Sequence, residues 1–273
     1  MYSAIGQILL LIIIGIIVTT PIIWGVLTSF KTEAEIATYP PKILDFTWTA
    51  ENYKTIIKGG IGTAFLMSVT YAGTTVIVDL VVGNLAAYAM SRHKFKGKKF
   101  LFYLILAGIP LSAGSVALVI ADYIYFSRLH MINTWFTLAL ISSVYHLPMS
   151  IWVLKGGMDN IPVEIEEAAA IDGCSRANII WFLIPRLNRP AIASASILAF
   201  IGVWNEFIVS SVMISNSKLR PLQLAIYNFI GFFGLQWGPL CAAATVSIIL
   251  VLLVFTLLGK QLVSGLTKGA VKG

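Results

Sequence analysis

Charged side chains are scarce in this sequence. They make up 11% of its 273 residues, while apolar residues make up 58%. An ordinary globular domain has about 25% charged residues, and one core could not hide so much apolar surface in a chain of this length. These figures exclude a disordered chain, a fibrous repeat and a simple water-soluble enzyme. They indicate a protein with several membrane spans.

Cysteine and the common catalytic motifs are nearly missing as well. The two cysteines, Cys174 and Cys241, are too few for a disulfide framework. The sequence has no G-x-x-x-x-G-K-[ST] nucleotide loop, no H-E-x-x-H zinc motif and no G-x-S-x-G nucleophile motif. Its three histidines are scattered along the chain. We therefore expect no catalytic residue, no metal site and no nucleotide chemistry in this chain itself.

Six stretches with at most one charge are long enough to cross about 30 Å of hydrocarbon as helices. They are residues 5–29, 62–90, 100–126, 132–154, 190–214 and 238–259. Strands of a membrane barrel would be shorter and would alternate apolar with polar residues, which these stretches do not. We predict an all-α membrane protein with six transmembrane helices, in which residues 1–273 form a single domain.

The positive charges indicate the orientation, because cytoplasmic loops of membrane proteins collect Lys and Arg. If the amino terminus is inside, the inner segments hold 12 of the 19 basic residues and the outer segments hold 7. We therefore expect both termini in the cytoplasm. The densest basic cluster, residues 92–99, is short and adjoins two spans. We interpret it as a determinant of topology and of contact with lipid headgroups, and we expect no nucleic-acid partner.

The inner connection, residues 158–190, begins with the pattern of a helix start. Asp159 or Asn160 can cap the free amides, and Pro162 suits the first helical turn. Three acids follow where a helix dipole favours anions: Glu164, Glu166 and Glu167.

The same connection then shows a turn and a second helix. Ala168 and Ala169 are good helix formers, and Gly173 can end the first helix in a left-handed conformation. We expect Ser175 to cap a second short helix that Pro185 stops. Such an elbow suits docking into a groove on another protein. The alternative is a solvated surface helix with no partner.

The run Glu167-Ala168-Ala169-Ala170-Ile171-Asp172-Gly173, with Pro185 downstream, resembles the EAA loop of binding-protein-dependent ABC importer permeases. Further stretches resemble the carbohydrate branch of that family, the maltose-type permeases. They are Ser29-Phe30-Lys31-Thr32, Asn52-Tyr53, Ala86-Ala87-Tyr88-Ala89, Trp204-Asn205-Glu206-Phe207 and the tail from Gly265 to Gly273. The resemblance covers essentially the whole chain. Cys174 departs from it, because the family usually has alanine there.

The resemblance implies a type I importer permease that forms half of a translocation pore in a bacterial cytoplasmic membrane. It implies import of an oligosaccharide, a second homologous permease, two ATP-binding cassette subunits that carry ATP and Mg, and an extracytoplasmic sugar-binding protein. In that family the EAA loop transmits closure of the ATPase pair to the membrane helices. The residues that would make this coupling contact are Glu164, Glu167, Ala168, Ala169, Asp172 and Gly173.

Polar groups inside a membrane are costly and usually face the bundle interior or a wet path. Four residues combine an aromatic face with amide and carboxylate groups, the mixture that binds sugars. They are Asp79, Trp204, Asn205 and Glu206. We assign them to a substrate path. The alternative is that Asp79 and Glu206 only lock helices together by hydrogen bonds.

Two outer loops complete the pattern. Residues 30–61 hold four lysines and four acids, so we expect a solvated loop without a strong field. The last outer loop carries Gln223, Tyr227 and Asn228, which correspond to the region of maltose-type permeases that reaches toward the binding protein. Three other functions stay open: import of another solute such as a glycerol phosphodiester, a stand-alone channel or secondary transporter, and a membrane-embedded enzyme.

Overall fold

The computed structural model describes residues 2–112, 116–231 and 234–270, and it is almost entirely helical. The chain divides into two compact units, which are described separately. The first comprises Met1–Phe65 and Leu224–Leu250, and the second comprises Leu66–Gln223 and Val251–Gly273. The prediction that the whole chain is one domain stays a prediction.

Four of the described helices are long and apolar enough to cross a membrane. They are Gly6–Ser29 of α1 (Tyr2–Ser29), α4 (Ile61–Arg92), α7 (Trp135–Met158) and Trp237–Leu257 of α14 (Trp237–Ala270). Their bounds agree with four of the six predicted spans. The predicted span 100–126 coincides with α5 (Lys98–Ser112) and α6 (Val116–Arg128), and residues 113–115 lie outside the described residues. The number six stays a prediction.

The predicted span 190–214 is not one helix, which corrects the sequence reading. Helix α11 (Arg189–Trp204) ends before Asn205, and α12 (Ile208–Met213) follows after a short break. The Glu206 carboxylate accepts hydrogen bonds from the amides of Val209 (2.6 Å) and Ser210 (2.9 Å) at the start of α12. A side chain that binds free amides in this way favours a new helix start over continuation of the preceding helix.

In the second unit, α7 packs against α11. Two glycines permit this close approach. A Cβ atom at Gly157 would lie 2.2 Å from Asn188 Oδ1 and 2.4 Å from Ala191 Cβ, and one at Gly202 would lie 2.1 Å from His146 Nε2. The backbones therefore approach more closely than any other residue would allow, as is common where membrane helices pack through small residues.

The predicted solvated loop, residues 30–61, is mostly exposed, and it folds into a cap around a few buried side chains. Lys31 is only 2% exposed. Its Nζ lies 4.4 Å from the Trp24 ring centroid and 4.9 Å from that of Phe46. It also donates to the carbonyl of Lys42 at 2.5 Å. Two aromatic faces and a carbonyl thus replace the water that the ammonium group loses.

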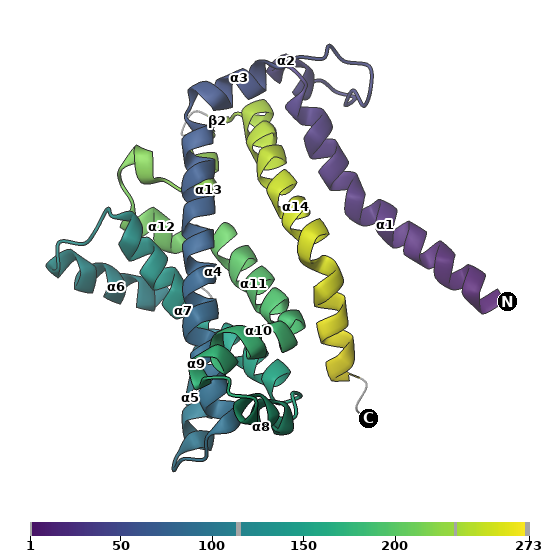
Figure 1. The fold of residues 1–273 in the computed structure, drawn as a ribbon. Coiled ribbons are helices and arrows are strands. Elements are labelled where there is room, and N and C mark those ends of the chain that lie inside the picture. The colour runs from purple at the N-terminus through teal and green to yellow at the C-terminus, as the bar shows by residue number, and fades with distance from the viewer. Residues whose placement is uncertain (1, 113–115, 232–233, 271–273) are drawn as a thin grey trace. The chain divides into compact units, whose positions relative to one another are not determined.

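Short helices and buried side chains organise the rest of this cap. Helices α2 (Glu33–Ile36) and α3 (Glu51–Lys58) lie above α1 and the start of α14 (Figure 1). The buried Asn52 amide donates to the carbonyls of Ser29 (2.9 Å) and Lys31 (2.8 Å). Glu33 accepts from the Gly238 amide at 2.9 Å and so ties the cap to the start of α14. The family-like residues Ser29, Lys31 and Asn52 therefore serve the fold of the cap.

A carboxylate in the cap is held in its charged form. Glu35 accepts a hydrogen bond from the Thr47 amide at 3.0 Å, and this bond is the largest of the effects that lower the pKa of Glu35 to about 2. Hydrogen bonds from Thr32 and the nearby Lys42 ammonium lower this pKa further. Because the folded pKa lies below the ordinary value, Glu35 supports the cap at neutral and mildly acidic pH. That support is lost as the pH falls through the folded pKa.

The close approach of α7 and α11 gives a first testable prediction. Gly157→Ala should lower the free energy of unfolding by about 1–3 kcal/mol, because its Cβ atom would collide with Asn188 and Ala191. The measurement is thermal unfolding of the detergent-solubilised protein. Gly156→Ala is the matched control, since a Cβ atom there meets nothing within 4 Å and alanine is the better helix former. Equal stability of the two variants would contradict the packing described here.

Candidate functional site

The acids and alanines of the inner connection that the sequence assigned to coupling lie in α8 (Val163–Ile171) and the turn that follows it. The helix begins directly after Pro162, whose side chain gives no cap, so the prediction that Asp159 or Asn160 caps it is wrong. Asp159 instead accepts from Lys155 Nζ at 2.5 Å, and the Asn160 amide donates to the carbonyl of Gly156 at 2.8 Å. Both side chains are thus used by the end of α7.

The turn after α8 confirms the role predicted for Gly173. Its φ is +89°, a conformation that favours glycine. The amide of Gly173 donates to the carbonyl of Ala170 at 3.1 Å, and that of Cys174 donates to Ala169 at 2.9 Å. These two bonds form a Schellman motif, which satisfies the last carbonyls of the helix. The Ser175 hydroxyl then accepts from the Asn178 amide at 3.2 Å and caps the next helix, as predicted.

Pro185 does not stop that second helix, which corrects the sequence reading. The helical run continues from α9 (Arg176–Asn178) through the π-helical turn η1 (Ile179–Leu183) into α10 (Ile184–Leu187). Pro185 is the second residue of α10, directly after this π-helical turn. The run ends at Asn188 instead, and α11 leaves at an angle of 82°.

Polar contacts, among them a buried ion pair, join the rear of α8 and the segment before it to the end of α4. Arg92 Nε lies 2.5 Å from Glu166 Oε1, and the two side chains are 9% and 8% exposed. Arg92 also donates to the carbonyl of Ile161 at 2.9 Å, and the Tyr88 hydroxyl donates to Glu166 Oε2 at 3.0 Å. The Ser91 hydroxyl donates to Asp159 at 2.6 Å. These contacts, which we call the α4–α8 junction, were missed in the sequence because the partners lie far apart in the chain.

The front of α8 carries the residues that the sequence assigned to coupling. Five of them are exposed: Glu164, Glu167, Ala168, Asp172 and Gly173. Ala169 is half-buried. Ile171 on the same segment is 86% exposed. The structure thus brings all six predicted residues together in α8 and the turn after it. One face of this helix binds α4, and the opposite face is exposed.

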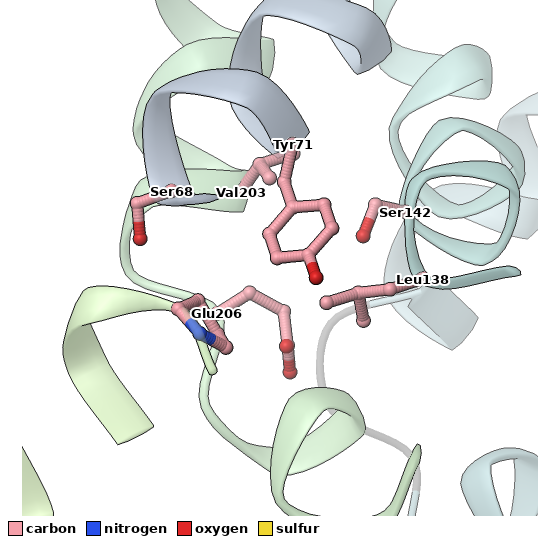
Figure 2. A pocket seen from close by; sticks show the side chains of 7 residues that line it. Ser68, Tyr71, Leu138, Ser142, Val203 and Glu206 are labelled. Carbon is pink, nitrogen blue, oxygen red and sulfur yellow. The ribbon is translucent and has the colours of Figure 1, made fainter. Parts of the chain in front are cut away.

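A small pocket lies in the second unit, between α4, α7, α11 and the break before α12 (Figure 2). Its lining residues are Ser68, Tyr71, Leu138, Ser142, Val203, Glu206 and Pro221. The Tyr71 hydroxyl and the Glu206 carboxylate point into the same space (Figure 2). The cavity volume is about 10 Å³, enough for roughly one water molecule.

The structure does not gather the four residues assigned to a substrate path in this pocket. Glu206 lines the pocket, and the other three are not among its lining residues. Asp79 is 1% exposed and accepts from the Ser150 hydroxyl of α7 at 3.2 Å. Trp204 is 1% exposed and stacks on Phe200, with ring centroids 5.5 Å apart. The amide of Asn205 donates to the carbonyl of Ile201 at 2.9 Å. The contacts of Asp79 favour the alternative that it locks α4 to α7.

A periodic signal in the sequence could have located part of the pocket. Ser68, Tyr71, Thr75 and Asp79 follow one another along α4 at helical spacing, and each is at most 4% exposed. Such a polar row on an otherwise apolar span marks the face that is turned away from lipid. Two of its members, Ser68 and Tyr71, line the pocket.

The residues assigned to docking of a binding protein lie at the end of a short helix. Gln223 and Tyr227 belong to α13 (Leu222–Tyr227), and Asn228 follows it. Gln223 is half-buried in the second unit, whereas Tyr227 and Asn228 are exposed in the first. Strands β1 (Ile230–Gly231) and β2 (Gly234–Leu235) then pair antiparallel, and residues 232–233 lie outside the described residues.

Two proteins similar to this chain are named as transport permeases. It is 32% identical over 268 residues to the trehalose/maltose transport system permease protein MalG of Thermococcus litoralis, covering 96% of this chain and 94% of that protein. It is 32% identical over 255 residues to the diacetylchitobiose uptake system permease protein DasC of Streptomyces coelicolor, covering 93% and 91%.

A solved structure and a family profile agree with these relatives. The fold matches a chain of a bacterial ABC transporter involved in import of the acidic polysaccharide alginate, with a TM-score of 0.81, 20% identity, and coverage of 95% of this chain and 96% of that one. The profile described as "Binding-protein-dependent transport system inner membrane component" matches residues 1–268. The chain therefore belongs to this family of membrane-embedded transporter permeases, which are not enzymes.

Proposed function

We propose that this chain is the permease subunit of an ATP-driven carbohydrate importer and that α8 couples it to an ATPase partner. The observation that carries this proposal is that α8 is fixed on one face and exposed on the other. Buried polar bonds hold its rear, while Glu164, Glu167, Ala168 and the very exposed Ile171 are left on its front. A rigid helix with a bare face of acids, small residues and one large apolar side chain suits a groove that offers basic and apolar groups.

The chemistry of the cargo follows from the relatives. Two of them are described as permeases for trehalose or maltose and for diacetylchitobiose, each at 32% identity over more than nine tenths of this chain. A third, at 32% identity, is described as a permease for sulfoquinovosyl glycerol. All three solutes contain a sugar ring. We therefore infer a sugar or sugar-derived solute and leave its length and linkage open.

Partners and orientation form the second part of the proposal. Because the pocket of the second unit has room for about one water, a sugar needs a wider path, which a second permease would help to form. Two ATP-binding cassette subunits would bind α8, and a solute-binding protein would bind the opposite side, where we assign Tyr227 and Asn228 to docking. Both termini would lie in the cytoplasm, as the distribution of Lys and Arg indicates.

A test of the coupling role reverses one charge on the front of α8. Glu167→Lys should leave the chain in the membrane but reduce uptake more than about tenfold, because a like-charge contact at an interface costs several kcal/mol. Gly173→Pro should do the same, since proline cannot adopt the φ of +89° found there. The measurements are ATP hydrolysis and uptake of radiolabelled trehalose, maltose, diacetylchitobiose and sulfoquinovosyl glycerol by membrane vesicles holding the whole transporter.

The control for the charge reversal is Asp45→Lys, which makes the same change at an exposed residue of the first outer loop. It should retain uptake and ATP hydrolysis. Normal uptake by both Glu167→Lys and Gly173→Pro would refute the assignment of α8 to coupling. Absence of an ATPase subunit from the purified wild-type assembly would refute the importer function altogether.

The orientation has its own test, because Cys174 is exposed directly after α8. In a Cys241→Ser background, a membrane-impermeant maleimide should not label Cys174 in intact cells. It should label Cys174 in inverted membrane vesicles from cells that express this chain alone. An added cysteine at Tyr39, which is 94% exposed in the first outer loop, should show the reverse pattern. Labelling of Cys174 from outside would place α8 on the wrong side for an ATPase.

A further inference from the structure

The α4–α8 junction does more than hold the rear of α8, because it joins α8 to a helix that the chain does not connect to it directly. A chain with few charged residues places an arginine and a glutamate side by side here, with their side chains 9% and 8% exposed. Burial of two charges is costly unless they pair and form further hydrogen bonds. Both conditions are met, since Arg92 also binds the Ile161 carbonyl and Glu166 also binds the Tyr88 hydroxyl. The pair thus fixes one geometry between two segments.

The residues on the α4 side of this junction lie on one helix face. Asn84, Tyr88, Ser91 and Arg92 are spaced by four, three and one residues, and each donates a hydrogen bond to the inner connection. The bond from Asn84 goes to the Ile180 carbonyl in η1, at 3.3 Å. The last two turns of α4 are therefore joined to the end of α7, to α8 and to η1. No peptide bond makes these connections.

We propose that Arg92 and Glu166 are positioning residues that make α4 move with the coupling helix α8. The proposal rests on the function of α8 proposed above. The chain itself links α8 directly only to α7 and, through η1 and α10, to α11. A displacement of α8 reaches α4 only through noncovalent contacts, and the buried ion pair is the most directional of them. The junction stays closed throughout the transport cycle, so that α4, α7 and α11 respond together.

The test measures motion of α4 and does not depend on a particular solute. Thr63 is exposed in the first turn of α4, about 43 Å along the helix from Arg92 at about 1.5 Å per residue. A Thr63→Cys reporter is placed in a Cys174→Ser, Cys241→Ser background of the whole transporter. Its rate of labelling by a maleimide is compared without nucleotide and with ATP plus vanadate.

The wild-type junction should give a nucleotide-dependent change in that rate, while Arg92→Glu should reduce the change to less than about one fifth. Arg92→Glu/Glu166→Arg should restore at least about half of it, because the exchanged charges can pair again. Lys218→Glu, the same charge change at an exposed residue outside the basic cluster 92–99, should keep the full response. If Arg92→Glu prevents assembly, Arg92→Lys replaces it, since lysine keeps the charge but lacks the planar fork. A full response in the variant, or none in the wild type, would overturn the proposal.

A disulfide tests whether the junction stays closed. Ser91→Cys and Asp159→Cys replace two side chains whose oxygens lie 2.6 Å apart. With the native cysteines replaced by serine and the bond formed by copper phenanthroline, ATP hydrolysis should stay within about twofold of the reduced form. A loss that a reducing agent reverses would show that the junction must open, and the proposal would fail. The function proposed for α8 would survive that result, because it fails only if no ATPase binds or if the α8 variants remain coupled.

Discussion

A buried amide holds the bend on which the inner face of the second unit depends. The chain turns by 82° at Asn188, between α10 and α11. Asn188 is 2% exposed, and its side chain donates to the carbonyl of Leu154 at 3.0 Å. This hydrogen bond ties the bend to α7, because Leu154 belongs to that helix. Gly157 leaves the space that this amide occupies. The bend in turn sets where η1 and α8 lie against α4.

Polar side chains specify the contacts between helices in this chain. Apolar side chains pack about as well against lipid tails as against one another, so they discriminate poorly among neighbours. The few polar groups do discriminate. Arg92 and Glu166 join α4 to α8, Asp79 and Ser150 join α4 to α7, and Asn52 fixes the outer cap. Only 11% of the residues are charged. Among the described residues, the buried charged side chains Lys31, Asp79 and Glu166 all make contacts of this kind.

Sequence reasoning succeeded where the cause of structure is local. The apolar stretches gave four helices, and the chemistry of Gly173 and Ser175 gave the turn after α8. The prediction from sequence failed where contacts between residues far apart in the chain determine the structure. Lys31 is buried because Trp24 and Phe46 surround it, which a balanced count of charges in the loop cannot reveal. Pro185 was predicted to end a helix, because the sequence does not show that it would be the second residue of α10. The partners Arg92 and Glu166 are 74 residues apart, and without aligned relatives nothing in one sequence links them.

The limited space inside the second unit bears on how a solute would pass. Both carboxylates that were assigned to a path are engaged in bonds within the chain: Asp79 with Ser150, and Glu206 with the first amides of α12. The pocket beside Glu206 admits about one water, whereas a sugar ring is many times larger. A path through this unit alone would require these bonds to break and the packed face of α4 to open. A path along its surface requires neither, but it needs a second wall. This favours the pore proposed above, in which a second permease supplies that wall.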